Sequence, residues 1–467
     1  MHVNITKNTY KGTTYYAVRI CKTHYENGKK TNKLVKTIGN TTDPDEVKKL
    51  KETAWNYILN KQKDIHLSLS EIKRIRPQSP IGLMRTIERI FSNLDVLQPM
   101  KKNFPNNYDE FLEEIAYRFY SITSERMLSF ITGKPKDRYY RLLDIIFQIK
   151  HELEDMFYNA LVNKGMITNH EVKIDTTSTY FEGNGISLAM FGYSRDHRGD
   201  KKQVLILLVL IDDYPLFSYV FEGNKKDVTV FLDTVKDLKT RIKCERFIIF
   251  CDRGFFNPDY LDALDKDRIF YVMAVPRRKS EWPERHDEKS NEFYIRGRRA
   301  ILYENTELRK ELLRELDETI EKIRKYLKIL TPSEIKRKYK YALKFINIKK
   351  KTLKEKIVEK EKKVLGRWIV LTNLKEDKTR EEIIDDYKSL QEIERDFHIL
   401  KSELDLRPIN HSKDERAIAH IYVCILTLLI KHIIQKEFGR DKLEEILGIF
   451  CYEIITEKGN LIWTEEV

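Results

Sequence analysis

The pattern of apolar and polar residues over residues 1–40 predicts strands. The segment TTYYAVRI is rich in β-branched and aromatic residues, and Asn27-Gly28, before TNKLVKTIG, predicts a hairpin turn. The pattern then becomes helical, because Asp43 followed by Pro44 is a typical helix start, and the predicted helix ends near residue 63. A small β-rich N-terminal unit with one helix is therefore expected.

A helical region follows this unit. Between residues 81 and 165, apolar side chains recur at steps of three and four, which is the spacing of one face of a helix. Pro77 and Pro80 stand in the segment before it and indicate a linker at 75–80.

After residue 170 the helical periodicity gives way to short and nearly continuous apolar runs. Such runs are typical of strands that are buried on both faces of a sheet. Helices alternate with these strands up to about residue 274, and a further strand and helix follow a long charged stretch. The predicted strands cover 172–180, 204–211, 216–222, 246–251, 269–274 and 367–373, and the predicted helices cover 226–241, 257–265 and 381–403.

This order of elements predicts an α/β fold with an RNase H-like catalytic core, in which helices flank a mixed sheet. That fold begins with three antiparallel strands, which are followed in order by a helix, a strand, a helix, a strand and a late helix. The charged stretch then becomes a large insertion before the last catalytic helix. The expected division is a β-rich unit at 1–70, a helical region at 80–168, the core at 170–275 and 366–430, the insertion at 276–365 and a C-terminal helical tail at 431–467.

Charge adds a class of partner to this picture. The 467 residues carry a net charge of +13, and such an excess of Lys and Arg favours polyanions, chiefly nucleic acid. A generally Lys-rich proteome is the alternative explanation. The five cysteines lack the spacing of a zinc site and suit a reducing cytoplasm. We expect no membrane segment, because the apolar runs at 204–211 and 422–430 are too short to span a bilayer. We also expect no nucleotide cofactor, because no glycine-rich phosphate loop occurs.

Three separated carboxylates are the candidate catalytic groups. Asp175 lies on or after the first predicted core strand, Asp252 ends an apolar run, and Glu394 lies on the late helix. Carboxylates from two strands and a helix can converge to hold hard divalent cations that act on phosphodiesters. Each one alone also fits an ordinary turn or surface acid, and Asp212 and Asp213 are the competing pair at a hairpin turn.

The helix with Glu394 has an apolar stripe and a polar margin. At about 100° per residue, Tyr387, Glu394 and Lys401 fall along nearly one line at the edge of the stripe. A position at this edge suits a catalytic Glu394, but it also suits a partly exposed surface acid. The stripe consists of Leu390, Ile393, Phe397, Leu400 and Leu404.

This helix resembles the Y-x2-R-x3-E-x6-K signature of the DDE insertion-sequence transposases known as the YREK superfamily. Tyr387, Glu394 and Lys401 fall on the Y, E and K, whereas Leu390 stands at the R position. The resemblance is to a subgroup of long transposases with a β-rich N-terminus, and it covers the chain from residue 10 to about 430. The further matching segments are DTTSTYFEG, GYSRDHRGDKKQ, CDRGFFN, LKSELDLRPINH and DERAIAHIYVCILTLLI.

The resemblance implies a catalytic and metal-binding triad of Asp175, Asp252 and Glu394. It would bind two Mg²⁺ or Mn²⁺ ions about 3.5–4 Å apart. The residues implied to bind DNA are Tyr387, Lys401, Arg195, Arg198, Lys201 and Arg253. A solvated hairpin loop is the alternative for the loop arginines and lysine. His197 could act as a general base, although water activated by a metal needs none, and His411 is interpreted as structural.

The function implied is cut-and-paste transposition of an insertion sequence by phosphodiester hydrolysis and transesterification. Its partners would be double-stranded DNA, as terminal inverted repeats and as target, and a second subunit in a synaptic homodimer. The N-terminal β unit and the helical region at 80–168 would bind the ends and support synapsis. The insertion, which carries Trp282, would contact DNA, or form a solvated hairpin or an oligomer contact. We expect a prokaryotic cytoplasmic protein associated with the nucleoid. The alternatives are a two-metal nuclease without strand transfer and a domesticated DNA-binding derivative.

Overall fold

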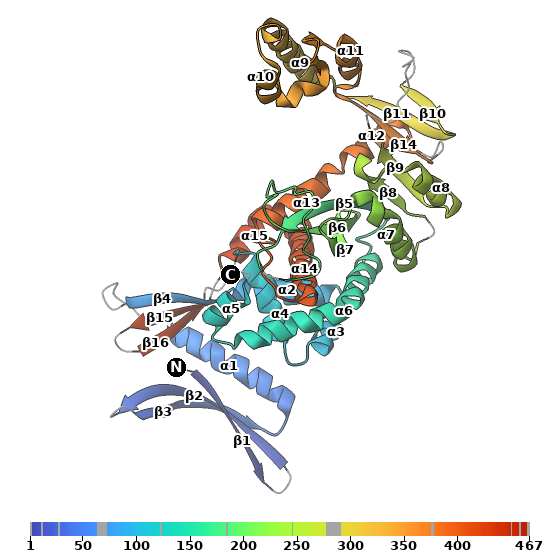
Figure 1. Ribbon diagram of the computed structural model, residues 1–467. Coiled ribbons are helices and arrows are strands. Elements are labelled where there is room, and N and C mark those ends of the chain that lie inside the picture. Colours follow the sequence, from blue (N-terminus) through green and yellow to red (C-terminus); the bar gives the residue numbers. More distant parts are fainter. Residues whose placement is uncertain are drawn as a thin grey trace. The chain divides into compact units, whose positions relative to one another are not determined.

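Figure 1 shows the helices and strands of the computed structural model. The chain forms two compact units. The first unit comprises 1–93, 97–139 and 433–467, and the second comprises 94–96 and 140–432. The residues that the structure describes are 2–10, 13–26, 29–62, 72–121, 124–183, 185–244, 246–276, 291–374, 378–449, 451–456 and 459–464.

A three-stranded antiparallel sheet with one helix opens the first unit. Its strands are β1 (His2–Tyr10), β2 (Thr13–Glu26) and β3 (Lys29–Thr41). The helix α1 (Pro44–Gln62) packs on one face of the sheet through Val18, Ile20 and Ala54. The predicted strands and helix are confirmed, while Asn27-Gly28 lies outside the described residues.

A second small sheet joins segments from the two ends of the chain. β4 (Ile72–Ser79) pairs with β15 (Cys451–Thr456), which pairs with β16 (Gly459–Thr464). The predicted linker at 75–80 is therefore wrong, and the C-terminal tail is not helical throughout. The partner strand is remote in the sequence, so local pattern could not reveal the pairing. β4 lies at the sheet edge, where a strand tolerates a proline such as Pro77.

The predicted helical region between 81 and 165 is confirmed. Its last helix begins in the first unit and continues into the second. The helices are α2 (Ile81–Asn93), α3 (Leu97–Asn103), α4 (Tyr108–Arg118), α5 (Glu125–Thr132) and α6 (Lys136–Asn163), and α15 (Arg440–Leu447) belongs to the C-terminal segment.

The second unit is built on an eight-stranded mixed sheet with the order β10-β11-β14-β9-β8-β5-β6-β7. β8 runs parallel to β5 and to β9, and the other neighbours are antiparallel. All six strands predicted from the apolar runs are present. The strands are β5 (Glu171–Tyr180), β6 (Gln203–Ile211), β7 (Tyr214–Glu222), β8 (Ile248–Cys251), β9 (Phe270–Ala274), β10 (Glu292–Ile295), β11 (Arg298–Glu304) and β14 (Arg367–Thr372).

Helices flank this sheet. Every residue of β6 is buried, as expected for a strand covered on both faces. Alternate residues of β6 pack with α13 and α14 in one apolar cluster, while β8, β9, β11 and β14 pack with α12 in another. The flanking helices are α7 (Asp227–Arg241), α8 (Pro258–Lys266), α12 (Arg380–Lys388), α13 (Gln391–Ser402) and α14 (Asp414–Phe438). The chain thus has the mixed α/β architecture expected from the sequence.

By length and composition, α14 is apolar enough to cross a membrane, although the apolar run at 422–430 alone is short. Within its most apolar window, 83% of the residues are buried inside the protein. Its apolar side chains, including Ile421, Ile425 and Leu428, pack against the sheet. Burial of this kind is typical of the core helix of a folded domain.

The single helix predicted at 381–403 is two helices. α12 ends at Lys388 and α13 begins at Gln391, with Ser389 and Leu390 between them. Tyr387 therefore lies on a different helix from Glu394 and Lys401, so the predicted line of three residues along one helix is wrong for Tyr387. Both intervening residues keep right-handed helical backbone angles, and neither is Gly or Pro. For that reason the break left no sequence signal.

The insertion contributes to the sheet and also forms a core of its own. β10 and β11 extend the sheet beyond β14, which the sequence did not predict. Leu316, Ile323, Ile335 and Phe345 belong to a separate apolar cluster. Trp282 lies outside the described residues. The other elements of the insertion are α9 (Thr306–Tyr326), α10 (Pro332–Lys338), β12 (Ile346–Asn347), β13 (Thr352–Leu353) and α11 (Glu355–Val364).

Candidate active site

The register of two parallel strands brings the first two candidate carboxylates together. Ile174 of β5 pairs with Cys251 of β8. Asp175, midway along β5, and Asp252, directly after β8, are the next residues on these strands and therefore occupy neighbouring positions. Ligands of α/β sheets bind at the carboxyl ends of strands, and Asp252 lies at such an end.

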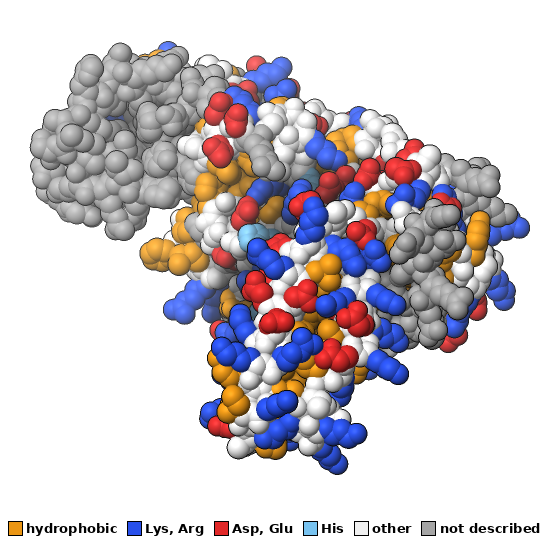
Figure 2. All heavy atoms as spheres, turned by 90° about the horizontal axis from the view of Figure 1, so that it is seen from above, with side chains coloured by type: hydrophobic (Ala, Val, Ile, Leu, Met, Phe, Trp, Pro, Cys, Tyr) orange, Lys and Arg blue, Asp and Glu red, His pale blue; other side chains and the backbone are white. Residues whose placement is uncertain are grey.

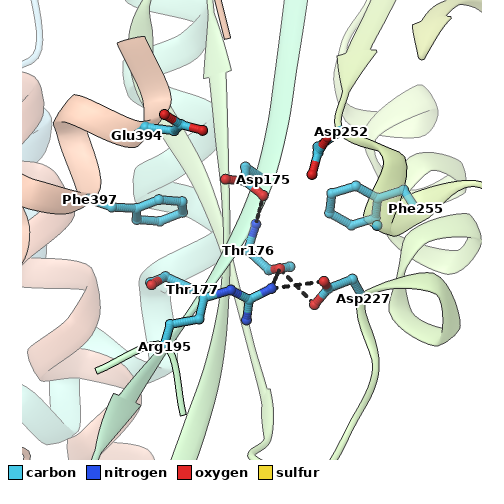
Figure 3. Close-up of a pocket in the computed structure, with 10 residues that line it drawn as sticks. Asp175, Thr176, Thr177, Arg195, Asp227, Asp252, Phe255, Glu394 and Phe397 are labelled. Atoms are coloured by element: carbon cyan, nitrogen blue, oxygen red, sulfur yellow. Dashed lines mark hydrogen bonds and ion pairs between the residues drawn. The ribbon is translucent and has the colours of Figure 1, made fainter. Parts of the chain in front are cut away.

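The helix α13 supplies the third carboxylate. Ile393, Phe397 and Leu400 are buried against the sheet, which turns Glu394 toward the cavity that Asp175 and Asp252 also line. Figure 3 shows the three carboxylates around one end of this pocket, with Phe397 and Phe255 on opposite sides. The pocket has a volume of about 350 Å³. The structure therefore gathers the three predicted catalytic residues in one site.

The pocket favours a bound cation electrostatically. Burial raises the pKa of Asp175 to about 7, and the carboxylates of Asp252 and Asp227 act in the same direction. The backbone N–H of Thr176 opposes this shift by donating a hydrogen bond of 2.7 Å to Asp175 Oδ1. Acidic groups with too little positive charge around them are stabilised by a metal ion.

The donor set fits a hard divalent cation. Three carboxylates offer only oxygen ligands, which Mg²⁺ and Mn²⁺ prefer over nitrogen or sulfur. Among the described residues these three carboxylates surround the pocket and do not close into a tight cluster. Such a spread is compatible with two ions, because a two-metal site distributes its ligands over both.

A fourth acid that the sequence did not single out also lines the pocket. Asp227, in the first turn of α7, accepts a hydrogen bond of 2.7 Å from Thr176 Oγ1 and forms an ion pair of 2.8 Å with Arg195. Arg195 Nη2 also donates to Thr176 Oγ1 at 2.9 Å. The dashed lines in Figure 3 show this network below the carboxylates. An acid that opens a helix directly after a core strand was the available signal, but it is also what ordinary helix starts contain.

Tyr387 lies between the apolar core and the site. Its ring packs in the apolar cluster of α12 with Ile383 and Ile384. Burial raises the pKa of Tyr387, and the neighbouring Asp252 raises it further. The phenol therefore stays protonated and lies close to Asp252, one of the three candidate carboxylates.

Lys401 is tied to the loop that precedes β6. Its Nζ donates to Asp196 Oδ1 at 2.8 Å and to the carbonyl oxygen of Ser178 at 2.9 Å. Glu394 and Lys401 thus share α13, as predicted, but Lys401 faces a second cavity next to the carboxylate pocket.

The other basic residues expected to contact DNA differ in their surroundings. Arg195 lines the pocket. Arg198 forms two hydrogen bonds of 2.8 Å with Asp200 on its own loop, and Lys201 lies 3.5 Å from Glu182. Arg253 follows Asp252 and is exposed. Their role in DNA binding stays a prediction.

The competing acids at the hairpin have structural partners. Asp212 accepts hydrogen bonds from the backbone N–H groups of Thr168, Asn169 and Glu171. Asp213 pairs with Lys173. The two acids form the two-residue turn between β6 and β7, so the turn interpretation of Asp212 and Asp213 is confirmed.

Comparison with known proteins identifies a family. The family model described as "Transposase DDE domain" matches residues 174–430, a stretch that includes all three candidate carboxylates. No curated protein sequence matches the chain. The "Cryo-EM structure of piggyBac transposase synaptic complex with hairpin DNA (SNHP)" is similar to this structure with a TM-score of 0.41 and 11% sequence identity, over 80% of this chain and 82% of that one.

Proposed function

The chain belongs to the family of transposases with a DDE domain, and on this premise we propose that it catalyses cut-and-paste transposition of an insertion sequence. It would cleave DNA at the element ends and join the 3′-ends to target DNA. We also propose that the core is RNase H-like and that the chain is a member of the YREK superfamily. The strand order β7-β6-β5-β8-β9 supports the fold assignment.

One observation carries the proposal: Asp175, Asp252 and Glu394 line a single pocket although they come from β5, the residue after β8 and a remote helix. Two of the three sit at neighbouring positions of a parallel strand pair. The three carboxylates repel the phosphates of DNA unless cations lie between them, because both groups are negatively charged. This composition favours metal-dependent phosphodiester chemistry over binding alone.

The catalytic roles follow from these positions. Asp175, Asp252 and Glu394 would hold two Mg²⁺ or Mn²⁺ ions, which supply activation of the attacking oxygen and stabilisation of the leaving 3′-oxygen when bound. Arg195 would bind a non-bridging phosphate oxygen beside the carboxylates, since Asp227 and Thr176 fix its guanidinium. Tyr387, kept neutral by burial, would hold Asp252 in orientation.

DNA would be contacted by more than the catalytic pocket. The first 41 residues carry eight Lys or Arg against one acid, Glu26, which suits a polyanion. Figure 2 shows Lys and Arg side chains interspersed with acidic ones over the face that it draws. We propose that the N-terminal sheet and the helices at 81–165 bind the element ends, that Arg198, Lys201, Arg253 and the insertion add phosphate contacts, and that two copies form the synaptic complex. A prokaryotic, nucleoid-associated protein is implied.

The proposal is tested with the DNA that flanks this coding sequence as substrate. Purified full-length protein, Mn²⁺ or Mg²⁺, labelled flanking DNA and a target plasmid should give cuts at fixed positions and joined products. Cut ends that are never joined, including when pre-cleaved ends are supplied, would indicate the nuclease without strand transfer. Binding without any cleavage would indicate a domesticated DNA-binding derivative.

A further inference from the structure

A second cavity adjoins the carboxylate pocket and has the opposite electrostatic character. It has a volume of about 420 Å³ and shares Arg195 and Phe397 with the pocket that holds the carboxylates. Arg195, Lys401 and Arg407 line it, against one carboxylate, Asp196. A DNA strand bound to the carboxylate pocket through metal ions would therefore meet positively charged side chains in the adjoining cavity.

Asp196 organises the cations of this cavity. Its side chain is only 3% exposed, and its Oδ1 accepts from Lys401 Nζ at 2.8 Å and pairs with Arg407 Nη1 at 2.5 Å. Within the part of the chain that the structure describes, Asp196 Oδ2 is buried without a hydrogen-bond partner. One carboxylate therefore faces two cations, and the group of three keeps a net charge of +1.

Lys401 of this group is also bound to β5, the strand that carries Asp175. Lys401 Nζ donates to the carbonyl oxygen of Ser178 at 2.9 Å, and Ser178 Oγ accepts from the backbone N–H of Arg195 at 2.8 Å. Ser178 lies on β5, three residues after Asp175. The position of the two cations is thus fixed relative to the carboxylates through Ser178.

The geometry points to Arg407 as a further phosphate-binding residue: Asp196 positions it beside Lys401, and the two cations together bind the backbone phosphate next to the phosphate undergoing reaction. This inference rests on the proposed function and on the DNA contact expected of Lys401, and it adds Arg407 and Asp196. Arg407 has five N–H donors, and its contact with Asp196 involves one nitrogen. Its side chain is 32% exposed, so it can reach a ligand while staying anchored.

Successive phosphates of one DNA strand can occupy the two adjoining cavities at the same time. Each strand carries one negative charge per about 3.4 Å of helix axis, so a strand in the carboxylate pocket presents further phosphates immediately beside it. Phe397, 7% exposed, forms a wall common to both cavities. A purely structural role, in which Asp196 only ties α13 to the loop before β6, is the competing account.

Salt-dependent binding separates the two accounts. Fluorescence anisotropy of the full-length protein with a labelled duplex of the flanking DNA, in Ca²⁺ and over about 50 to 200 mM NaCl, gives the slope of log affinity against log salt. Arg407→Gln should reduce the magnitude of that slope by about 1, because one phosphate contact is lost. Arg407→Lys keeps the positive charge and should restore most of the lost slope. Lys266→Gln, an equal charge loss at the exposed end of α8, should leave the slope unchanged.

Asp196→Asn tests the positioning role. The cations remain, so binding should stay within about threefold of wild type or tighten, whereas cleavage at saturating DNA should slow about tenfold because the subsite is misplaced. Unchanged slopes in a folded Arg407→Gln protein, or unchanged cleavage in Asp196→Asn, would overturn the inference. If the wild-type protein binds with the expected slope but cuts nothing, the proposed function fails while the subsite stands.

Discussion

Asp227 and Arg195 form an ion pair of 2.8 Å on the wall of the carboxylate pocket. The pair places a fourth acid beside the three that the sequence singled out. Asp227 either anchors Arg195 or takes part in metal binding, and the two roles have different consequences.

We expect Asp227 to act as the anchor, because its oxygens are engaged by Arg195 and Thr176. Asp227→Asn should then slow cleavage about tenfold and leave the Mg²⁺ concentration for half-maximal rate unchanged. A titration of cleavage rate against Mg²⁺ measures both quantities. Asp233→Asn, an exposed acid on the same helix, is the control. A large rise in the Mg²⁺ requirement of Asp227→Asn would make Asp227 a metal ligand instead.

Leu390 occupies the position where the signature of the YREK superfamily, to which we propose this chain belongs, carries arginine. It packs in the apolar cluster of α12 with Ile383 and Ile384, so Leu390→Arg should lower the free energy of unfolding by about 1–3 kcal/mol and should not speed cleavage. Urea titration followed by circular dichroism measures the first effect. Gln391→Arg places the same charge on the exposed neighbour and should leave the free energy of unfolding nearly unchanged. Faster cleavage by a stable Leu390→Arg protein would show that the site lacks a positive charge.

A buried charge network ties α6 to the sheet and to α7. Glu154 Oε1 accepts from Lys150 Nζ at 2.5 Å and from the backbone N–H of Ser218, and Glu154 Oε2 pairs with Arg241 at 3.0 Å. Glu154→Ala leaves two cations buried without their shared partner, so the free energy of unfolding should fall by about 3–5 kcal/mol.

The matched control for this change is Glu152→Ala, which removes an exposed acid from the same helix. Chemical denaturation of both variants should separate them clearly. A loss as small in Glu154→Ala as in the control would mean that Lys150 and Arg241 find other partners.

The pair between Asp144 of α6 and Arg416 of α14 gives a pH-dependent contribution. Two hydrogen bonds of 2.7 and 2.8 Å from Arg416 lower the pKa of Asp144. Because the folded state binds this proton more weakly than the unfolded state, the stabilisation is present above the ordinary pKa of Asp and is lost as the pH falls through the lowered one.

Asp144→Asn should therefore reduce stability at pH 7 by no more than about 1 kcal/mol, since Asp144 is 37% exposed. The difference from wild type should shrink as the pH approaches 3. Thermal unfolding at several pH values measures it. A difference that grows toward low pH would contradict the assigned direction.

The strands of the core were predictable from local sequence because they are continuous apolar runs. A run such as 204–211 is apolar at every position, and β6 is buried at every position. The two-residue turn at Asp212 and Asp213 and the start of α1 at Pro44 also depend on neighbouring residues alone. These local signals sufficed to place Asp175, Asp252 and Glu394 on elements that meet.

What the sequence missed depends on contacts between distant residues. The pairing of β4 with β15 joins positions such as Ile75 and Ile454, and no local pattern carries that information. Asp227 resembles any acid in the first turn of a helix until Arg195 is found beside it. The anchoring of Lys401 by Asp196 is likewise visible only in three dimensions.

Cleavage of the flanking DNA by Asp252→Asn tests the central claim most directly. This change keeps the shape of the side chain and removes one metal-binding charge, so the cleavage rate in Mn²⁺ should fall by roughly three orders of magnitude or more, while binding of the same duplex stays near wild type. Cleavage by Asp252→Asn at a rate close to that of the wild-type protein would contradict the assignment of the site.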